Sequence, residues 1–268
     1  MASLYSSSTC GLAAWAAGRL EAGVDIIHVI GRREQTGGPL GARSGLQAEL
    51  AALDAQRARL VDLRGAAILE DAAQIVRQGG VDAVETEIVH GDLLATLASH
   101  EGDAALVLIG KRGEAADYAI GHLGSNLERI VRTAKRPVLV AARACRPVNK
   151  VLVAHDGSAV SLRLIDHMAR SPLFAGLTAE IVHVGPETPE NTRRLADAEA
   201  LLRAGGIKAR SRIAQGSPDV VLSRIVDEEA FDMLVMGAFQ HSRIRSLLIG
   251  STTAQMIHSC RVPVLLLR

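Results

Sequence analysis

The chain repeats one ordered set of short sequences. Four stretches of the first half recur in the second half in the same order: DIIHVI as EIVHVG, LVLIG as MLVMG, LGS as IGS, and RPVLVAAR as VPVLLLR. The last two pairs share an offset of 126 residues, and the second pair differs from that offset by one. Because four matches in one order do not arise readily by chance, we interpret the chain as a tandem duplication.

Each half alternates short apolar runs with amphipathic helical patterns. This alternation is typical of α/β folds in which helices connect parallel strands. In the second half the pattern predicts strands at KVLVAH, AEIVHV, KARSRI, DMLVMG and VPVLLLR. The predicted helices cover Val160–Arg170, Pro189–Ala204, Pro218–Glu229 and Thr252–Ser259, and Ser217 is expected to cap the third of them.

The linker between the halves is predicted at Arg143–Lys150, which contains proline and little apolar periodicity. We therefore expect one domain over residues 1–146 and a second over residues 147–268. The first half is longer, because 82 residues separate His28 from Gly110 whereas 54 separate His183 from Gly237. The additional residues fall in an Ala/Leu/Glu/Arg-rich segment at about 44–78, which predicts a hairpin of helices covering the sheet.

Composition narrows the class of function. Thirty basic residues offset 29 acidic ones, which argues against a nucleic-acid-binding protein. The three scattered cysteines form no CxxC motif, so neither a disulfide framework nor a zinc site is expected. No apolar run reaches membrane-spanning length and no signal peptide is recognisable, so we expect a soluble cytoplasmic protein.

Two glycine-containing loops follow strands at equivalent places in the two halves. The first reads IGKRGEAADYAIGHLGSNLERI and the second MGAFQHSRIRSLLIGST. Glycine allows close backbone approach, and the exposed N–H groups at a helix start favour an anion. The same loops also serve as tight connections with nothing bound. The spacing by itself leaves both interpretations open.

The combination of these motifs resembles the universal stress protein family over essentially the whole chain. The resemblance is carried by VLVAHDGS at the start of the second half, by Gly-x-x-Gly and Gly-Ser after the fourth strand of the first half, and by the terminal PVLVA and PVLLL runs. It implies two tandem domains of the adenine nucleotide alpha hydrolase-like type, each with an open five-stranded parallel sheet of order 3-2-1-4-5. Some members of the family bind ATP or AMP, and Mg²⁺ is expected only if ATP is bound.

The resemblance also implies which positions would contact a nucleotide. Asp156 would hold the adenosine end, and the backbone of Val184 would contact adenine. The phosphates would lie against Gly237, Gly250, Ser251 and Thr252. The matching positions of the first half are Val29, Gly110, Gly113, Gly124, Ser125 and Asn126. No catalytic residue and no metal-ligating residue is assigned.

Both copies depart from the family pattern. Gln240 stands where the second loop glycine belongs, and MAS stands in the first half where the second half has DGS. The first strand of the first half, which is central in the expected sheet order, is therefore predicted to be missing. Two explanations are open: the natural reading frame begins further upstream, which we favour, or this half lacks the strand.

These features favour a regulatory stress-response protein, not a metabolic enzyme. The terminal strands RPVLVAA and VPVLLLR are expected to pair, making a pseudo-dimer within one chain, and two chains could associate further. Other proteins are the expected partners. A slow ATP hydrolase and a scaffold that has lost nucleotide binding are the alternative hypotheses.

Overall fold

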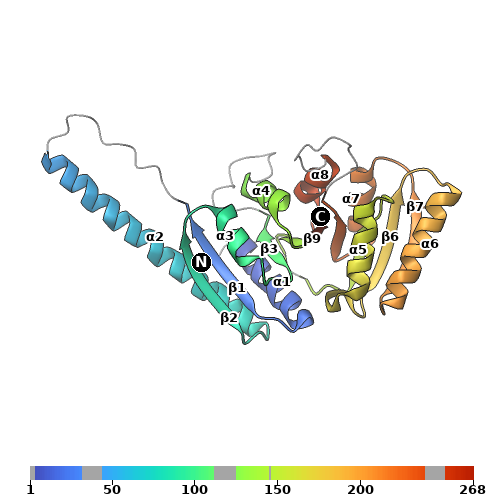
Figure 1. Cartoon of the computed structure of the whole chain (residues 1–268), viewed down its shortest axis with the longest axis horizontal. Coiled ribbons are helices and arrows are strands. Elements are labelled where there is room, and N and C mark those ends of the chain that lie inside the picture. Colours follow the sequence, from blue (N-terminus) through green and yellow to red (C-terminus); the bar gives the residue numbers. More distant parts are fainter. Residues whose placement is uncertain (1–3, 32–43, 112–124, 145, 239–250) are drawn as a thin grey trace.

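The computed structural model describes residues 4–31, 44–111, 125–144, 146–238 and 251–268 (Figure 1). In the second half, five strands form a parallel arrangement of order β9-β8-β5-β6-β7. Numbered within that half, this is the predicted order 3-2-1-4-5. The strands are β5 (Lys150–Ala154), β6 (Thr178–Val184), β7 (Lys208–Ala214), β8 (Met233–Gly237) and β9 (Val264–Leu267).

The connecting helices of the second half lie within one residue of their predicted bounds. Ser158 and Thr188 cap helices α5 and α6, because each hydroxyl accepts a hydrogen bond from the backbone N–H three residues later. The expected cap at Ser217 is wrong. Its hydroxyl makes no cap hydrogen bond and donates instead to Asp219. The helices are α5 (Ala159–Arg170), η1 (Pro172–Phe174), α6 (Pro189–Ala204), α7 (Pro218–Glu228) and α8 (Ser251–Ser259).

The first half contains two separate pairs of parallel strands. β1 pairs with β2, and β3 pairs with β4. Among the described residues no strand lies between β1 and β3, at the place that β5 occupies in the second half. The elements are α1 (Leu4–Leu20), β1 (Val24–Ile30), α2 (Ser44–Gln78), β2 (Val84–His90), α3 (Leu93–His100), β3 (Val107–Gly110), α4 (Ser125–Thr133) and β4 (Val138–Ala141).

The edge of β1 that faces away from β2 has backbone groups oriented to pair with a further strand. The N–H of Val24 and the C=O of Ile30 bond toward β2, so the alternate residues Asp25, Ile27 and Val29 direct their backbone groups to the opposite edge. In the second half the matching residues of β6 face β5, since the C=O of Val182 accepts from the N–H that follows β5. Among the described residues, no strand pairs with this edge of β1.

The two halves are joined into one seven-stranded sheet by their last strands. β4 and β9 pair antiparallel, with Leu139 opposite Leu265 and Val138 opposite Leu266. The predicted pairing of the terminal strands is confirmed. Each half also donates a hydrogen bond to the other at this junction. Lys111 of the first half donates to the carbonyl of Cys260, and Arg268 of the second half donates to the carbonyl of Arg132. Both carbonyls lie at helix C-termini, where positive charge is favourable.

The hydrophobic core is shared between the halves. Leu12 and Ala16 of α1 pack into the same cluster as the interior of β5 and β8. Arg19 donates to the carbonyl of Leu173 at 2.7 Å, and the Ser8 hydroxyl donates to that of Ala142 at 2.6 Å. Helix α1 thus fastens the β1–β2 pair to the rest of the molecule, since its other face packs on α2.

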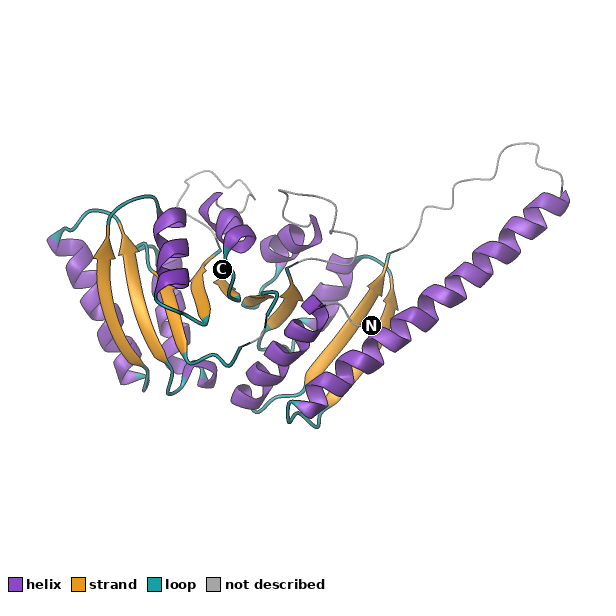
Figure 2. Ribbon diagram, turned by 180° about the vertical axis from the view of Figure 1, so that it is seen from behind, coloured by secondary structure: helices purple, strands orange, loops and turns teal. Residues whose placement is uncertain are grey.

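The insertion does not form the expected hairpin. Residues 44–78 make a single helix of 35 residues, α2, which is about 50 Å long at 1.5 Å per residue. Its second part packs on β1 and α1, and a Cβ added at Gly65 would lie only 3.0 Å from the His28 ring. Its first part extends away from the body in both views (Figures 1 and 2).

Truncation of Leu139 tests the importance of the strand junction. The side chain is fully buried opposite Leu265, so Leu139→Ala should lower the free energy of unfolding by about 2–5 kcal/mol. Leu162→Ala is the control, because Leu162 is 50% exposed and its truncation should cost less than about 0.5 kcal/mol. Chemical denaturation measures both values. Equal effects would show that the junction contributes little to stability.

Candidate functional site

A cleft lies at the carboxyl ends of the central strands of the second half. This is the position at which open α/β sheets bind ligands, beside the reversal of strand order at β5 and β8. Four positions predicted from the resemblance are brought together here: Asp156, Val184, Gly237 and Thr252. The remaining lining residues are Ala154, His155, Ser158, Ser161, Val182, Pro218, Leu222, Met236 and Thr253.

The turn between β5 and α5 fixes the position of Asp156. Its Oδ1 accepts a hydrogen bond from the N–H of Ser158 at 2.9 Å. Gly157 between them has a φ of +76°, a conformation that a residue with a Cβ adopts only under strain. A Cβ at Gly157 would also lie 2.8 Å from the guanidinium of Arg194. The Asp-Gly-Ser sequence is therefore required by the turn as well as suited to a ligand.

The opposite wall of the cleft is formed where β8 ends and α8 begins. Gly237 closes β8, and a Cβ there would lie 2.9 Å from Val160. The glycine thus permits close packing of the strand end against α5. The buried hydroxyl of Thr253 is directed back to the carbonyl of Gly237 at 3.4 Å. Thr252 lines the cleft from the first turn of α8.

Several predicted phosphate-loop positions lie outside what the structure describes. Gly250, and Gln240 at the place of the second loop glycine, fall within residues 239–250, which are not described. Ser251 begins α8, but its side chain is not described. The role of this loop accordingly stays a prediction.

The equivalent positions of the first half do not form a comparable site among the described residues. Gly110 ends β3 and Asn126 is exposed in the first turn of α4. Gly113 and Gly124 fall outside the described residues, and Ser125 is placed only as the first residue of α4. In the described part of this half, no strand stands at the β5 position to supply a wall with an acidic residue.

The two histidines beside the cleft have structural contacts. Nδ1 of His183 lies 3.0 Å from the carbonyl oxygen of His155, which fits a hydrogen-bonded core histidine. His155 is 3% exposed, and its Nε2 has no hydrogen-bond partner among the described residues. Burial lowers the pKa of His155, which opposes the smaller effect of the Asp156 carboxylate, so the ring is kept neutral near pH 7.

Metal and redox chemistry find little support in the part of the chain that is described. Within it, no group of three or more His, Cys, Asp or Glu side chains could hold a metal ion. Cys260 is buried, and burial raises the pKa of its thiol, which suppresses the reactive thiolate. Cys10 is likewise buried, with a raised pKa.

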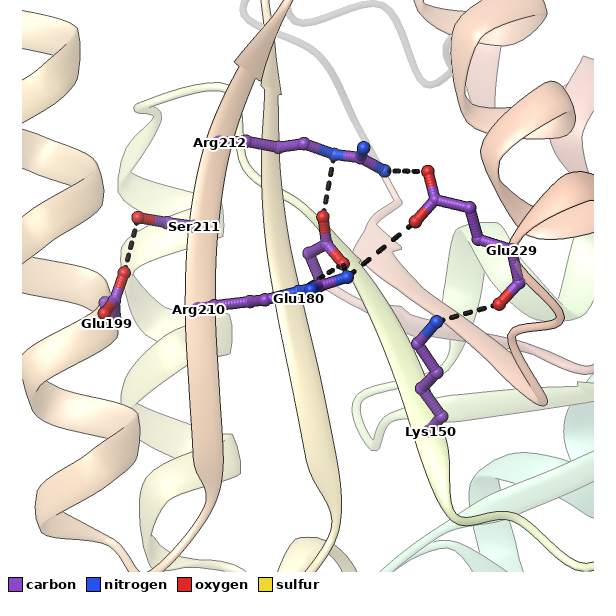
Figure 3. A network of polar contacts seen from close by, with 7 residues as sticks. All are labelled: Lys150, Glu180, Glu199, Arg210, Ser211, Arg212 and Glu229. Atoms are coloured by element: carbon purple, nitrogen blue, oxygen red, sulfur yellow. Dashed lines mark hydrogen bonds and ion pairs between the residues drawn. The ribbon is translucent and has the colours of Figure 1, made fainter.

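A second polar cluster lies on the same sheet but away from the strand ends (Figure 3). Glu180 is 3% exposed and pairs with Arg210 and with Arg212, whose Nε lies 2.7 Å from its Oε1. Arg212 also pairs with Glu229 at 2.5 Å, and the Lys150 ammonium donates to the carbonyl of Glu229 at 2.8 Å. The Glu180 carboxylate is paired with two arginines, although the Nε–H of Arg212 is not aligned for a hydrogen bond, and the cluster ties the end of α7 to β6 and β7.

Sequence reasoning missed the third wall of the cleft. Pro218 and Leu222 of α7 line it, together with Ser161 of α5 and the buried Thr253. Ser217-Pro218 signals only a helix start, and nothing in the sequence shows that this helix begins beside the ends of β5 and β6. A signal was available in the sheet order, because the helix that follows an edge strand returns across the central strands.

Comparison with known proteins agrees with this architecture. The model of the universal stress protein family matches residues 2–142 and 185–268. The universal stress protein Slr1230 of Synechocystis is 35% identical over 275 residues, covering 98% of this chain and 96% of that protein. The chain is a member of the universal stress protein family. Residues 143–184, which include Asp156 and Val184, lie outside the two matched ranges.

More distant relatives and a solved structure share the organisation. The universal stress protein Rv2005c of Mycobacterium tuberculosis is 26% identical over 232 residues, covering 76% of this chain and 77% of that protein. The crystal structure of a universal stress protein from Archaeoglobus fulgidus matches with a TM-score of 0.69 at 20% identity, covering 97% of this chain and 93% of that one. In the described part of the chain, no helix combines the length and apolar character needed to cross a membrane.

The buried histidine predicts a pH dependence of stability. Because the folded pKa of His155 lies below its usual 6.5, the unfolded chain takes up a proton first as the pH falls. The stabilisation is complete above pH 6.5 and is lost progressively below it. His155→Gln should therefore reduce the slope of unfolding free energy against pH between about 6.5 and 5, where one proton contributes up to about 1.4 kcal/mol per pH unit.

Urea denaturation at several pH values measures this slope. The control is His100→Gln, because the pKa of His100 is raised by its hydrogen bond to the Thr96 carbonyl and by Glu87. The stabilisation by His100 is lost as the pH rises above 6.5, so its removal should change the slope in the opposite direction and chiefly above pH 6.5. Identical slopes in wild type and His155→Gln would contradict a buried neutral ring.

Proposed function

We propose that the protein is a regulatory stress-response module whose second half, residues 147–268, binds an adenine nucleotide without rapid hydrolysis. The first half, residues 1–146, is proposed as a companion domain without a complete site. The observation that carries the proposal is the convergence of Asp156, Val184, Gly237 and Thr252 on one cleft at the carboxyl ends of the strands. These residues come from four different elements or turns.

The adenosine end is proposed to lie between β5 and β6. The Asp156 carboxylate, which accepts from the Ser158 N–H through Oδ1, has the chemistry to accept also from a ribose hydroxyl. The apolar side chains of Val182, Val184 and Leu222 line the cleft and suit the face of a purine. The backbone of Val184, at the end of β6, would contact the adenine edge.

The phosphates are proposed to lie toward the start of α8. Helix N-termini favour anions, and Thr252 supplies a hydroxyl there, with Gly250 and Ser251 as further proposed contacts. The enclosed part of the cleft measures only about 80 Å³. This is below the roughly 300–1,000 Å³ of typical ligand pockets. The cleft would therefore enclose only part of a nucleotide, which favours weak binding of ATP or AMP.

A regulatory role fits the chemistry better than catalysis. His155, which lines the cleft, is buried and held neutral, and Asp156 is engaged in its turn. Neither is arranged as a general base toward a phosphate. If ATP is the ligand, Mg²⁺ would accompany it as a phosphate counter-ion. The cytoplasm is the proposed location.

Nucleotide titration tests the proposal directly. Calorimetry with ATP and with AMP should show one site in the wild type, unaffected by Gly124→Val in the first half. Asp156→Asn keeps the acceptor for the Ser158 N–H but removes the charge, so it should weaken binding by about tenfold or more. Loss of binding in Gly124→Val with retention in Asp156→Asn would transfer the site to the first half.

The same proteins distinguish the alternatives. Release of phosphate from ATP, abolished by Asp156→Asn, would establish the slow hydrolase in place of the non-hydrolysing module. An absence of binding by the wild type at millimolar ATP and AMP would leave the scaffold hypothesis and remove both nucleotide-dependent ones.

A further inference from the structure

The first part of helix α2 carries exposed leucines without a partner among the described residues. Leu50, Leu53 and Leu60 are 44%, 59% and 59% exposed, and Val61 is 37% exposed. At 3.6 residues per turn these four fall within an arc of about 100° on the helix, which is the width of an apolar stripe that faces a core. We call these four residues the α2 stripe.

The α2 stripe is distinct from the surface that attaches α2 to the body. The buried residues Leu69, Ala72, Ala73 and Val76 occupy an arc centred about 120° away from the stripe. They pack with α1 and the β1–β2 pair. The stripe lies on the part of the helix that extends away from the molecule in Figures 1 and 2, so nothing in the described chain covers it.

The charged residues beside the α2 stripe favour a second copy of the same helix as its binding partner. Asp54 and Arg57 are exposed and lie beside the leucines, one turn apart. A two-fold axis crossing the helix between Ala55 and Gln56 would bring Leu50 opposite Val61 of the partner subunit. Leu53 would then lie opposite Ala58 of the partner subunit, with Leu60 of the partner subunit about 3 Å further along the helix axis. The same axis would bring Asp54 opposite Arg57 of the partner subunit, so an apolar contact and a charged contact are each complementary, and each is made twice.

Other arrangements are less favourable. A parallel pair would set Asp54 beside Asp54 and Arg57 beside Arg57, which are like-charge contacts. A purely apolar partner would leave the Arg57 guanidinium without a counter-charge at the centre of the stripe. From this self-complementarity we infer that the α2 helices of two chains pair antiparallel and form a homodimer.

This interface is separate from the proposed nucleotide site and from the β4–β9 junction. Its geometry places the two bodies at opposite ends of a helical bridge, because each α2 attaches through its C-terminal part. The seven-stranded sheet is thus not required to pair with another sheet for two chains to associate.

Sedimentation velocity of the full chain over the micromolar range tests the inference. The wild type should sediment as a reversible dimer, and Leu53→Glu/Leu60→Glu should weaken self-association by at least about tenfold, since central apolar contacts carry most interface energy. The control Leu162→Glu, at a residue of α5 that is 50% exposed, should leave association unchanged. A monomeric wild type, or a dimer unaffected by the double substitution, would overturn the inference.

A charge exchange tests the antiparallel direction and does not depend on the leucines. Asp54→Arg and Arg57→Asp should each weaken the dimer, because each creates a like-charge contact across the axis. The combined variant Asp54→Arg/Arg57→Asp should restore it, since opposite charges again face each other. Failure of the combined variant to recover association would exclude the antiparallel pair. Circular dichroism should show unchanged helicity in all variants.

Discussion

Strands β4 and β9 cover each other's edges, and the two halves of the molecule depend on that contact. Each strand is the last of its own half, and without the other it would expose a row of unpaired backbone groups. Their antiparallel pairing extends the sheet to seven strands and merges the interiors of both halves into shared clusters. The reciprocal contacts of Lys111 and Arg268 with helix ends of the opposite half belong to the same arrangement.

The two copies have diverged most on the far side of this junction. In the second half β5 fills the centre of the sheet, and its following turn holds Asp156 at the cleft. In the first half, no described strand pairs with β1 at the same place. The equivalent outer strands of the two halves carry opposite charges. β7 presents Arg210 and Arg212 to the buried Glu180, whereas β2 carries Glu85 and Glu87 opposite β1. Duplication preserved the framework and left each copy with different chemistry.

Much of the fold followed from patterns in the sequence. Short apolar runs and helix-start residues located the strands and helices of the second half to within a residue or two. The repeat predicted that the central strand of the first half is missing, and none lies there among the described residues. The family resemblance supplied the strand order. The candidate site was predicted in part, because Asp156, Val184, Gly237 and Thr252 converge as expected. Pro218 and Leu222 were not foreseen, since their place in the cleft depends on where α7 crosses the sheet.

The sequence alone determined the duplication and the alternation of strands and helices, because these depend on local spacing and residue type. Only the tertiary structure determined which distant segments lie against each other. It showed that residues 44–78 form one helix whose first part packs on no other described element, although helical propensity is equally satisfied by a hairpin. It also showed that the buried Glu180 is compensated by arginines thirty residues away, a pairing that only the register of β6 with β7 brings about.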